Sequence, residues 1–230
     1  MFLDLLLNKD PQGAIISFLL SVPVIILVLS VHEYAHGYVA KKLGDPTAEN
    51  LGRLTLNPLK HIDLIGFLMF LVVGVGYAKP VPINSRYFKK PRRDMALVGA
   101  AGPISNFLMA ILFTGIIKIL QVIFSFVPVA AVPEWTPAAL GYAFQILGLG
   151  VFYNLAFMIF NLIPVPPLDG SRILYAFLPS KALLWVQKYE RFFFWGILAL
   201  FFLSSFLNIS PIGIAVDFLM KLLFKLFFIA

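Results

Sequence analysis

The sequence predicts an all-α polytopic membrane protein, with residues 1–230 forming a single membrane-embedded domain. Hydrophobic residues make up 60% of the chain, charged residues only 13%, and 24 residues are phenylalanine. The mean hydropathy is +0.93. A soluble domain of this length cannot bury so much apolar surface, so we expect most of it to face a lipid bilayer.

Six apolar runs account for this composition. They cover about 13–40, 64–78, 95–127, 139–165, 192–207 and 211–229. A helix needs about 20 apolar residues to cross a bilayer. The runs 95–127 and 139–165 exceed that length, and 13–40 reaches it when its polar end is counted. The last run carries a stripe of charged residues, which is as typical of an interfacial helix as of a span. We therefore expect about five to six apolar membrane segments.

The run 64–78 is predicted to be re-entrant, entering the membrane and returning on the same side. It has only 15 residues, three of them glycine, and is too short for a regular span. The flanking loops 40–62 and 79–94 are both rich in lysine and arginine. Basic loops favour the cytoplasm. A span would separate these two loops, whereas a re-entrant segment keeps both inside.

The loop 79–91 is predicted to form a short surface hairpin or edge strand. Prolines at 80, 82 and 91 alternate with apolar residues such as Val81 and Ile83, a pattern found at the edges of sheets. An exposed edge of this kind could hold an extended substrate peptide by strand addition.

A metal-binding pattern, His32-Glu33-Tyr34-Ala35-His36, closes the first run. Residues four apart share one helix face, so His32 and His36 can bind one Zn²⁺ while Glu33 lies beside the reacting water as general base. By itself the pattern can occur by chance on a soluble amphipathic helix. Here its flanks are apolar, and an ionisable side chain in hydrocarbon costs roughly 2.5 kcal/mol or more, so a bound cation is the favoured explanation.

Asp169 is the predicted third metal ligand. The first and fourth runs both run from outside to inside in the topology that the loop charges favour, so the segment Leu168-Asp169-Gly170 lies at the depth of the two histidines. The chain has no cysteine, which leaves His, Asp, Glu and water as ligands. A His₂Asp site with water in the fourth position suits hydrolysis. The alternative is a turn residue or helix N-cap.

Asn106 is predicted to contact substrate backbone or the developing oxyanion, because a carboxamide at membrane depth needs a partner. The alternative is a helix–helix hydrogen bond worth about 0.6–2 kcal/mol. Gly102 is expected only to let helices approach closely. His61 is interpreted as an interfacial or packing histidine, since a lone histidine offers no ligand spacing.

These motifs resemble those of the site-2 proteases, the intramembrane zinc metalloproteases. The resemblance covers most of the chain and rests on four segments: His32–His36, Leu168–Gly170, Gly102-Pro103-Ile104-Ser105-Asn106, and Gly52–Pro58 taken with Lys79–Pro82. The last of these resembles the short bacterial branch, in which we expect no PDZ or CBS domain. The resemblance implies a core of three helices around one zinc, recessed from the cytoplasmic side of a bacterial or archaeal cell membrane.

The function expected is hydrolysis of a peptide bond within or near a transmembrane segment of a substrate protein. Two alternatives stay open. A transporter would need polar residues along the whole first span, whereas its first half offers only Ser17, Ser21 and Ser30. A non-catalytic metal-binding scaffold would not need Glu33. Although the net charge is +7, the lysines and arginines lie mainly between apolar runs, so we expect lipid and not nucleic acid as their partner. The sequence does not indicate an oligomeric state.

Overall fold

The structure is a computed structural model that describes residues 11–73, 78–128, 133–207 and 210–228. Within these described residues, three helices are long and apolar enough to cross a membrane: α2 (Pro11–Lys42), α5 (Pro91–Ser125) and α6 (Thr136–Leu162). They coincide with the first, third and fourth apolar runs, so the prediction of a helical membrane protein is confirmed at this level. Helices suit a bilayer because every backbone polar group is paired within the element.

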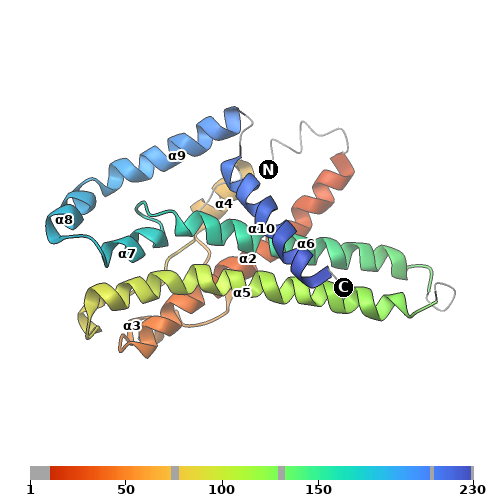
Figure 1. Cartoon of the computed structure of the whole chain (residues 1–230), viewed down its shortest axis with the longest axis horizontal. Helices are drawn as coiled ribbons and strands as arrows, with labels where there is room; N and C mark the ends of the chain where they lie inside the picture. The colour runs from red at the N-terminus through yellow and green to blue at the C-terminus, as the bar shows by residue number, and fades with distance from the viewer. Residues whose placement is uncertain (1–10, 74–77, 129–132, 208–209, 229–230) are drawn as a thin grey trace.

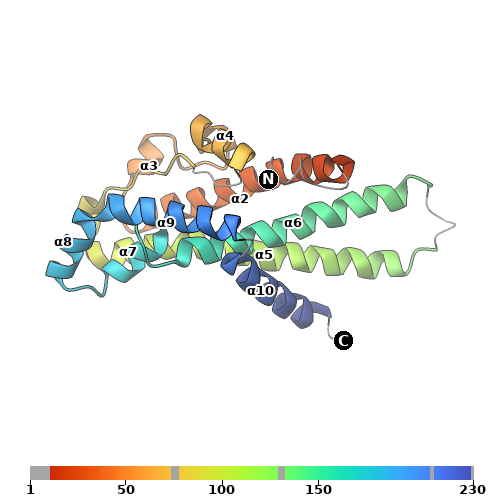
Figure 2. The same cartoon turned by 90° about the horizontal axis from the view of Figure 1, so that it is seen from above.

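These three helices form the body of the molecule. Helices α5 and α6 run antiparallel and side by side, and α2 packs against both at one end (Figures 1 and 2). Helix α10 (Pro211–Phe228) crosses α5 and α6 and seals an apolar cluster between the three helices. The buried members of that cluster are Ala110, Ile117, Val151, Leu155, Val216 and Leu223.

Shorter elements gather where α2 ends, α5 begins and α6 ends. They are α3 (Thr47–Asn50), η1 (Pro58–Lys60), η2 (Ser85–Tyr87) and α7 (Asp169–Tyr175), and α7 packs directly on α5. Beyond α7 the chain continues through α8 (Ser180–Lys188) and α9 (Glu190–Phe206), which is drawn in blue along one side of Figure 1. The elements that carry the predicted site residues therefore converge at this end of the bundle.

The re-entrant candidate contains a helix, α4 (Leu64–Val73), followed by residues 74–77, which lie outside the described residues. The two ends of the segment meet. Ile62 and Ala78 form an isolated antiparallel bridge, and the Lys79 N–H donates to the His61 carbonyl oxygen at 2.8 Å. Its entry and exit thus lie side by side.

The predicted surface hairpin is wrong for the described residues of segment 79–91. The backbone there is extended up to η2, but it forms no strand. Two prolines remove donors that a ladder would need, and several of the remaining backbone groups bond to side chains instead. The Val81 N–H donates to Glu33, the Asn84 N–H to Asp45, and the Arg53 guanidinium donates to the carbonyl oxygens of residues 79 and 80.

Candidate metal centre

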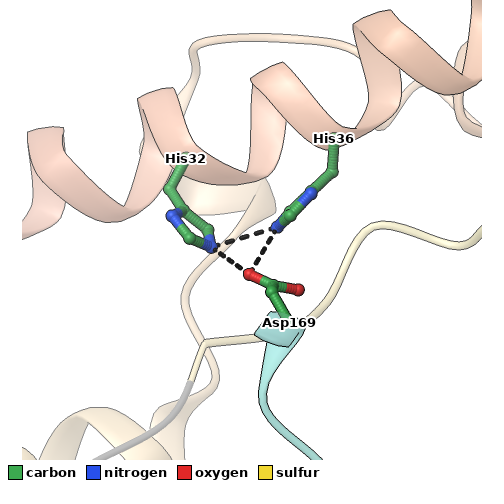
Figure 3. A group of neighbouring side chains, drawn as sticks. All are labelled: His32, His36 and Asp169. Carbon is green, nitrogen blue, oxygen red and sulfur yellow. Dashed lines mark hydrogen bonds and ion pairs between the residues drawn. The ribbon is translucent and has the colours of Figure 1, made fainter. Parts of the chain in front are cut away.

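Three side chains from two distant parts of the chain converge on one point, as predicted. His32 and His36 lie one turn apart on α2, and Asp169 is the first residue of α7. His32 Nε2, His36 Nε2 and Asp169 Oδ2 are each 3.0 Å from the other two atoms (Figure 3). All three residues are buried, with 3–6% of their surface exposed.

The outer nitrogen of each histidine faces a carbonyl oxygen. His32 Nδ1 lies 2.6 Å from Asn106 Oδ1, and His36 Nδ1 lies 2.7 Å from the backbone oxygen of Val98. A carbonyl oxygen only accepts, so both Nδ1 atoms must carry the proton. Both Nε2 atoms then keep a lone pair that points toward the centre. This outer hydrogen bonding is typical of histidines that bind a metal.

The donor set fits zinc. Two imidazole lone pairs and a carboxylate oxygen lie 3.0 Å from one another with no proton required between them. These electron-rich atoms repel one another, and a bound cation removes the repulsion. Zinc bonds of about 2.0–2.1 Å at tetrahedral angles separate ligand atoms by about 3.3 Å, slightly more than these separations. Among the described residues, His32, His36 and Asp169 are the one group whose ligand atoms cluster for a metal ion.

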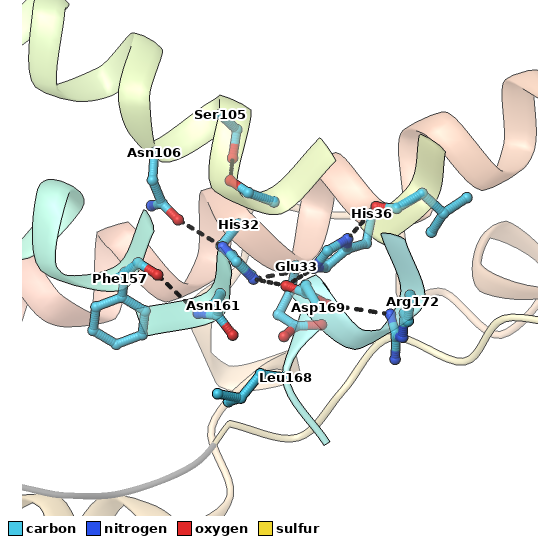
Figure 4. A network of polar contacts seen from close by, with 12 residues as sticks. His32, Glu33, His36, Ser105, Asn106, Phe157, Asn161, Leu168, Asp169 and Arg172 are labelled. Carbon is cyan, nitrogen blue, oxygen red and sulfur yellow. Dashed lines mark hydrogen bonds and ion pairs between the residues drawn. The ribbon is translucent and has the colours of Figure 1, made fainter. Parts of the chain in front are cut away.

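Asp169 reaches the histidines because α6 ends at Leu162 and a proline-rich segment turns the chain back into α7. Leu168, not Asp169, occupies the N-cap position of α7. One oxygen of Asp169 faces the two histidines, and the other lies 3.4 Å from Arg172 Nη1 (Figure 4). This ion pair with Arg172 favours the ionised form of the Asp169 carboxyl group.

Glu33 lies beside this group on the same turn of α2 (Figure 4). It is not one of the three convergent residues. Its Oε2 accepts a hydrogen bond from the Val81 N–H at 2.8 Å. The extended segment after Ala78 therefore fixes the orientation of this carboxylate.

Asn106 lies on α5 with no exposed surface. Its Oδ1 faces His32, and its amide nitrogen donates to Asn154 Oδ1 at 2.9 Å. These contacts match the helix–helix alternative, while contact with substrate or an oxyanion stays a prediction. The sequence reasoning missed Asn154, which the cost of a buried carboxamide could have singled out as it did Asn106. His61 is also buried, and its Nε2 faces the Thr55 carbonyl oxygen at 2.7 Å, as expected of a packing histidine.

Gly102 has a more specific role than general helix packing. A Cβ atom at this position would lie 2.5 Å from His32 Cε1 and 2.6 Å from the Nε2 atoms of both His32 and His36. We therefore expect Gly102→Ala to displace an imidazole and to weaken zinc binding at least about tenfold, because outer changes around metal ligands commonly cost 10–100-fold in affinity. Zinc competition with a chelator measures this.

A matched control is Gly148→Ala on α6, where an added Cβ meets nothing within 4 Å. Alanine favours the helix by about 1 kcal/mol over glycine, so this control should keep wild-type affinity. Wild-type zinc affinity in the Gly102→Ala protein would contradict the close approach of α5 to the histidines.

Comparison with known proteins agrees with this geometry. Residues 18–204 match the family model described as Peptidase family M50. YwhC of Bacillus subtilis, named as a candidate zinc metalloprotease, is 38% identical over 192 residues, which cover 83% of this chain and 81% of the relative. Rip2 of Mycolicibacterium smegmatis, named in the same way, is 28% identical over 158 residues, which cover 66% of this chain and 55% of the relative. No solved structure matches the chain significantly.

The matched region contains both histidines on α2 and Asp169 on α7, and it covers α5, α6 and most of α2. The chain is therefore a membrane-type zinc metallopeptidase and belongs to peptidase family M50, the site-2 protease family.

Proposed function

We propose that residues 1–230 form a single membrane-embedded metalloprotease domain that hydrolyses a peptide bond within or near a transmembrane segment of a substrate protein. The observation that carries the proposal is the convergence of two histidine nitrogens and a carboxylate oxygen at 3.0 Å, buried between helices long enough to span a membrane. A membrane-protein substrate and the surrounding lipid are the proposed partners.

His32, His36 and Asp169 are the proposed ligands of one zinc per chain. The burial of all three residues shields the ligand atoms from bulk water, and the outer hydrogen bonds of the two histidines fix the direction of their Nε2 atoms. When bound, zinc supplies a Lewis acid that polarises the scissile carbonyl and lowers the pKa of its water to about 7.

Glu33 is the proposed general base. It takes the proton of the attacking water and returns it to the leaving amine. The bond from the Val81 N–H supports this role, because it fixes one carboxylate oxygen and so limits the rotamers of Glu33. Asn106 supports the chemistry through His32, and a direct contact with the oxyanion is a second proposed role.

We propose that the site opens toward the cytoplasm. The end of the bundle that carries the site is basic. Lys41 and Lys42 end α2, and Arg92 and Arg93 begin α5, a charge pattern that favours the inner side of a bacterial or archaeal cell membrane. The contact between the two ends of segment 64–78 supports a re-entrant path for it.

We expect Lys60 and Lys89 to face the same compartment, because they flank the re-entrant segment. Each is replaced singly by cysteine in a chain that has none, and intact cells are treated with a membrane-impermeant thiol reagent. Both sites should stay unmodified until the cells are lysed. Opposite accessibility would mean that 64–78 crosses the bilayer.

Removal of zinc tests the proposed function. The purified chain in liposomes is treated with a chelator, and cleavage of a model membrane substrate should fall to the level of liposomes without enzyme. Zinc added back should restore cleavage, because the ligand residues keep their outer hydrogen bonds. Cleavage that survives complete removal of the metal would contradict the proposal.

The transporter alternative has less support. Of the three serines between Gly13 and Ser30, Ser21 and Ser30 donate to the carbonyl oxygens of residues 18 and 26 in their own helix, and Ser17 accepts from Gln145 on α6. The backbone of α2 thus accepts from two of the three hydroxyls that a polar path would need. A non-catalytic metal-binding scaffold needs no general base, so it does not explain why Glu33 lies beside the proposed metal ligands.

A further inference from the structure

A chain of hydrogen bonds connects the proposed metal ligand His32 to the backbone of α6. Asn154 Nδ2 donates to the Gly150 carbonyl oxygen at 2.8 Å, and Asn106 Nδ2 donates to Asn154 Oδ1 at 2.9 Å. Asn106 Oδ1 then accepts from His32 Nδ1 at 2.6 Å. Both asparagines have no exposed surface. This series of hydrogen bonds therefore connects α6, α5 and α2 inside the protein.

The direction of every bond in this chain follows from its far end. The carbonyl oxygen of Gly150 can only accept, so the nitrogen of Asn154 must face it and the oxygen of Asn154 must face Asn106. That oxygen needs a donor, so the nitrogen of Asn106 faces it in turn. The oxygen of Asn106 is then left for His32, where only a protonated Nδ1 can satisfy it.

We propose that Asn154 is a positioning residue that sets the tautomer of His32 through Asn106. With Asn154 in place, His32 carries its proton on Nδ1 and directs the Nε2 lone pair toward the metal. Without it, the Asn106 amide can flip and present its NH₂ group to Nδ1. That contact favours the proton on Nε2, where it blocks metal binding.

The packing of α5 on α6 explains why the chain of bonds can form. A Cβ atom at Gly150 would lie 2.8 Å from Phe113 Cδ2, so the absence of a side chain there lets the two helices approach closely. The same helix that ends near Asp169 thus also controls His32 through Asn154. The hydrogen bonds of Asn154, Asn106 and His32 therefore connect helices α6, α5 and α2 at the metal site.

His36 provides an internal comparison. Its Nδ1 faces the backbone oxygen of Val98 directly, with no intervening carboxamide. A backbone carbonyl cannot flip, so the tautomer of His36 should not depend on Asn154. His32 and His36 differ in this respect although they share one site.

The first experiment reads the tautomers directly. The metal-free 230-residue chain is labelled with ¹⁵N-histidine, and its three histidines are His32, His36 and His61. The His32 signals are assigned with a His32→Gln protein. In the Asn154→Leu variant we expect the His32 proton to move from Nδ1 toward Nε2 while His36 is unchanged. A His32 spectrum identical to that of the wild type would overturn the proposal.

The second experiment measures zinc affinity by chelator competition. Asn154→Leu should weaken binding about 10–100-fold, the usual effect of losing an outer partner of a metal ligand. In an Asn106→Ala background the same substitution should have no further effect, because Asn154 acts only through Asn106. If the losses of zinc affinity from the two substitutions add in the double variant, Asn154 has a general packing role, and the proposal is overturned.

Two further variants separate positioning from folding. Asn154→Asp is expected to keep affinity within about threefold, because burial keeps the acid neutral and its O–H and C=O reproduce the two bonds of Asn154. Thr114→Val is the control, since the buried Thr114 hydroxyl bonds only to the Ala110 carbonyl oxygen of its own helix in the described residues. It should bind zinc as the wild type does. If Asn154→Leu does not fold, the test uses Asn154→Asp instead. A loss of zinc affinity in Asn154→Asp as large as the loss in Asn106→Ala would contradict the proposal.

The inference rests on the proposed role of His32 as a zinc ligand, and the two can fail separately. Unchanged zinc binding in His32→Ala would remove that role and the proposed site with it. Loss of zinc in His32→Ala together with wild-type affinity in Asn154→Leu would leave the proposed function intact and remove only the role of Asn154.

Discussion

Asp169→Ala is expected to lose both bound zinc and proteolysis. The substitution leaves two imidazoles that face each other at 3.0 Å without the carboxylate that completes the group. We expect zinc affinity to fall by more than about 100-fold, beyond the usual effect of losing an outer partner. Elemental analysis and cleavage of a model membrane substrate, both made on the same preparation, measure the two effects.

Two conservative variants test whether Asp169 acts as a ligand. Asp169→Glu should restore function in part at best, because an added methylene moves the oxygen by about 1 Å from a ligand distance of about 2.0–2.2 Å. Asp169→Asn should lose most of its zinc, whereas a turn residue would tolerate this change. Full zinc occupancy in the Asn variant would exclude Asp169 as an essential ligand.

Asp63→Ala is the matched control for Asp169. Asp63 accepts a hydrogen bond from the Gly66 N–H at the start of α4, so its loss removes an aspartate from a helix start without touching the metal group. We expect a small loss of stability, of about 0.5–2 kcal/mol, and wild-type zinc content.

Glu33→Gln is expected to lose proteolysis while keeping zinc. Glu33 is not among the convergent ligand atoms, and glutamine keeps an oxygen that can accept from the Val81 N–H. Removing a general base lowers turnover by about 10²–10⁴-fold. The variant should therefore hold about one zinc per chain and bind uncleaved substrate, so co-purification followed by mass spectrometry can identify the substrate.

The matched control is Glu49→Gln, which breaks an exposed ion pair with Lys41 away from the metal group. Exposed pairs contribute only about 0–1 kcal/mol to stability, so this protein should cleave as the wild type does. Normal activity in Glu33→Gln would exclude the proposed base, and loss of zinc in that variant would show a ligand role instead.

Two kinds of signal in the sequence predicted the long helices and the convergence of His32, His36 and Asp169. An uncharged run of about 20 residues has few alternatives to a membrane helix, and α2, α5 and α6 follow those runs. His32 and His36 are four residues apart, which places both on one face of a helix and can be read directly from the sequence. Asp169 was found by topology, since the loop charges put the ends of α2 and α6 at one depth.

The remaining features depend on contacts between distant residues. Asn154 is 48 residues from Asn106, and no local pattern indicates that their amides meet. Gly102 resembled any small residue in a packed helix until the structure brought both imidazoles to within 2.6 Å of its absent side chain. The hairpin prediction failed because the alternation of residues in 79–91 does not reveal that Glu33 and Asp45 take its backbone donors.

The position of the cut in a membrane substrate tests the central claim most directly. The wild-type chain and Glu33→Gln are each reconstituted with a model single-span substrate in liposomes, and the products are measured by mass spectrometry. We expect fragments that end within or next to the transmembrane segment with the zinc-loaded wild type, and none with Glu33→Gln at equal zinc content. Cuts confined to soluble loops, or the same fragments from Glu33→Gln, would contradict the account.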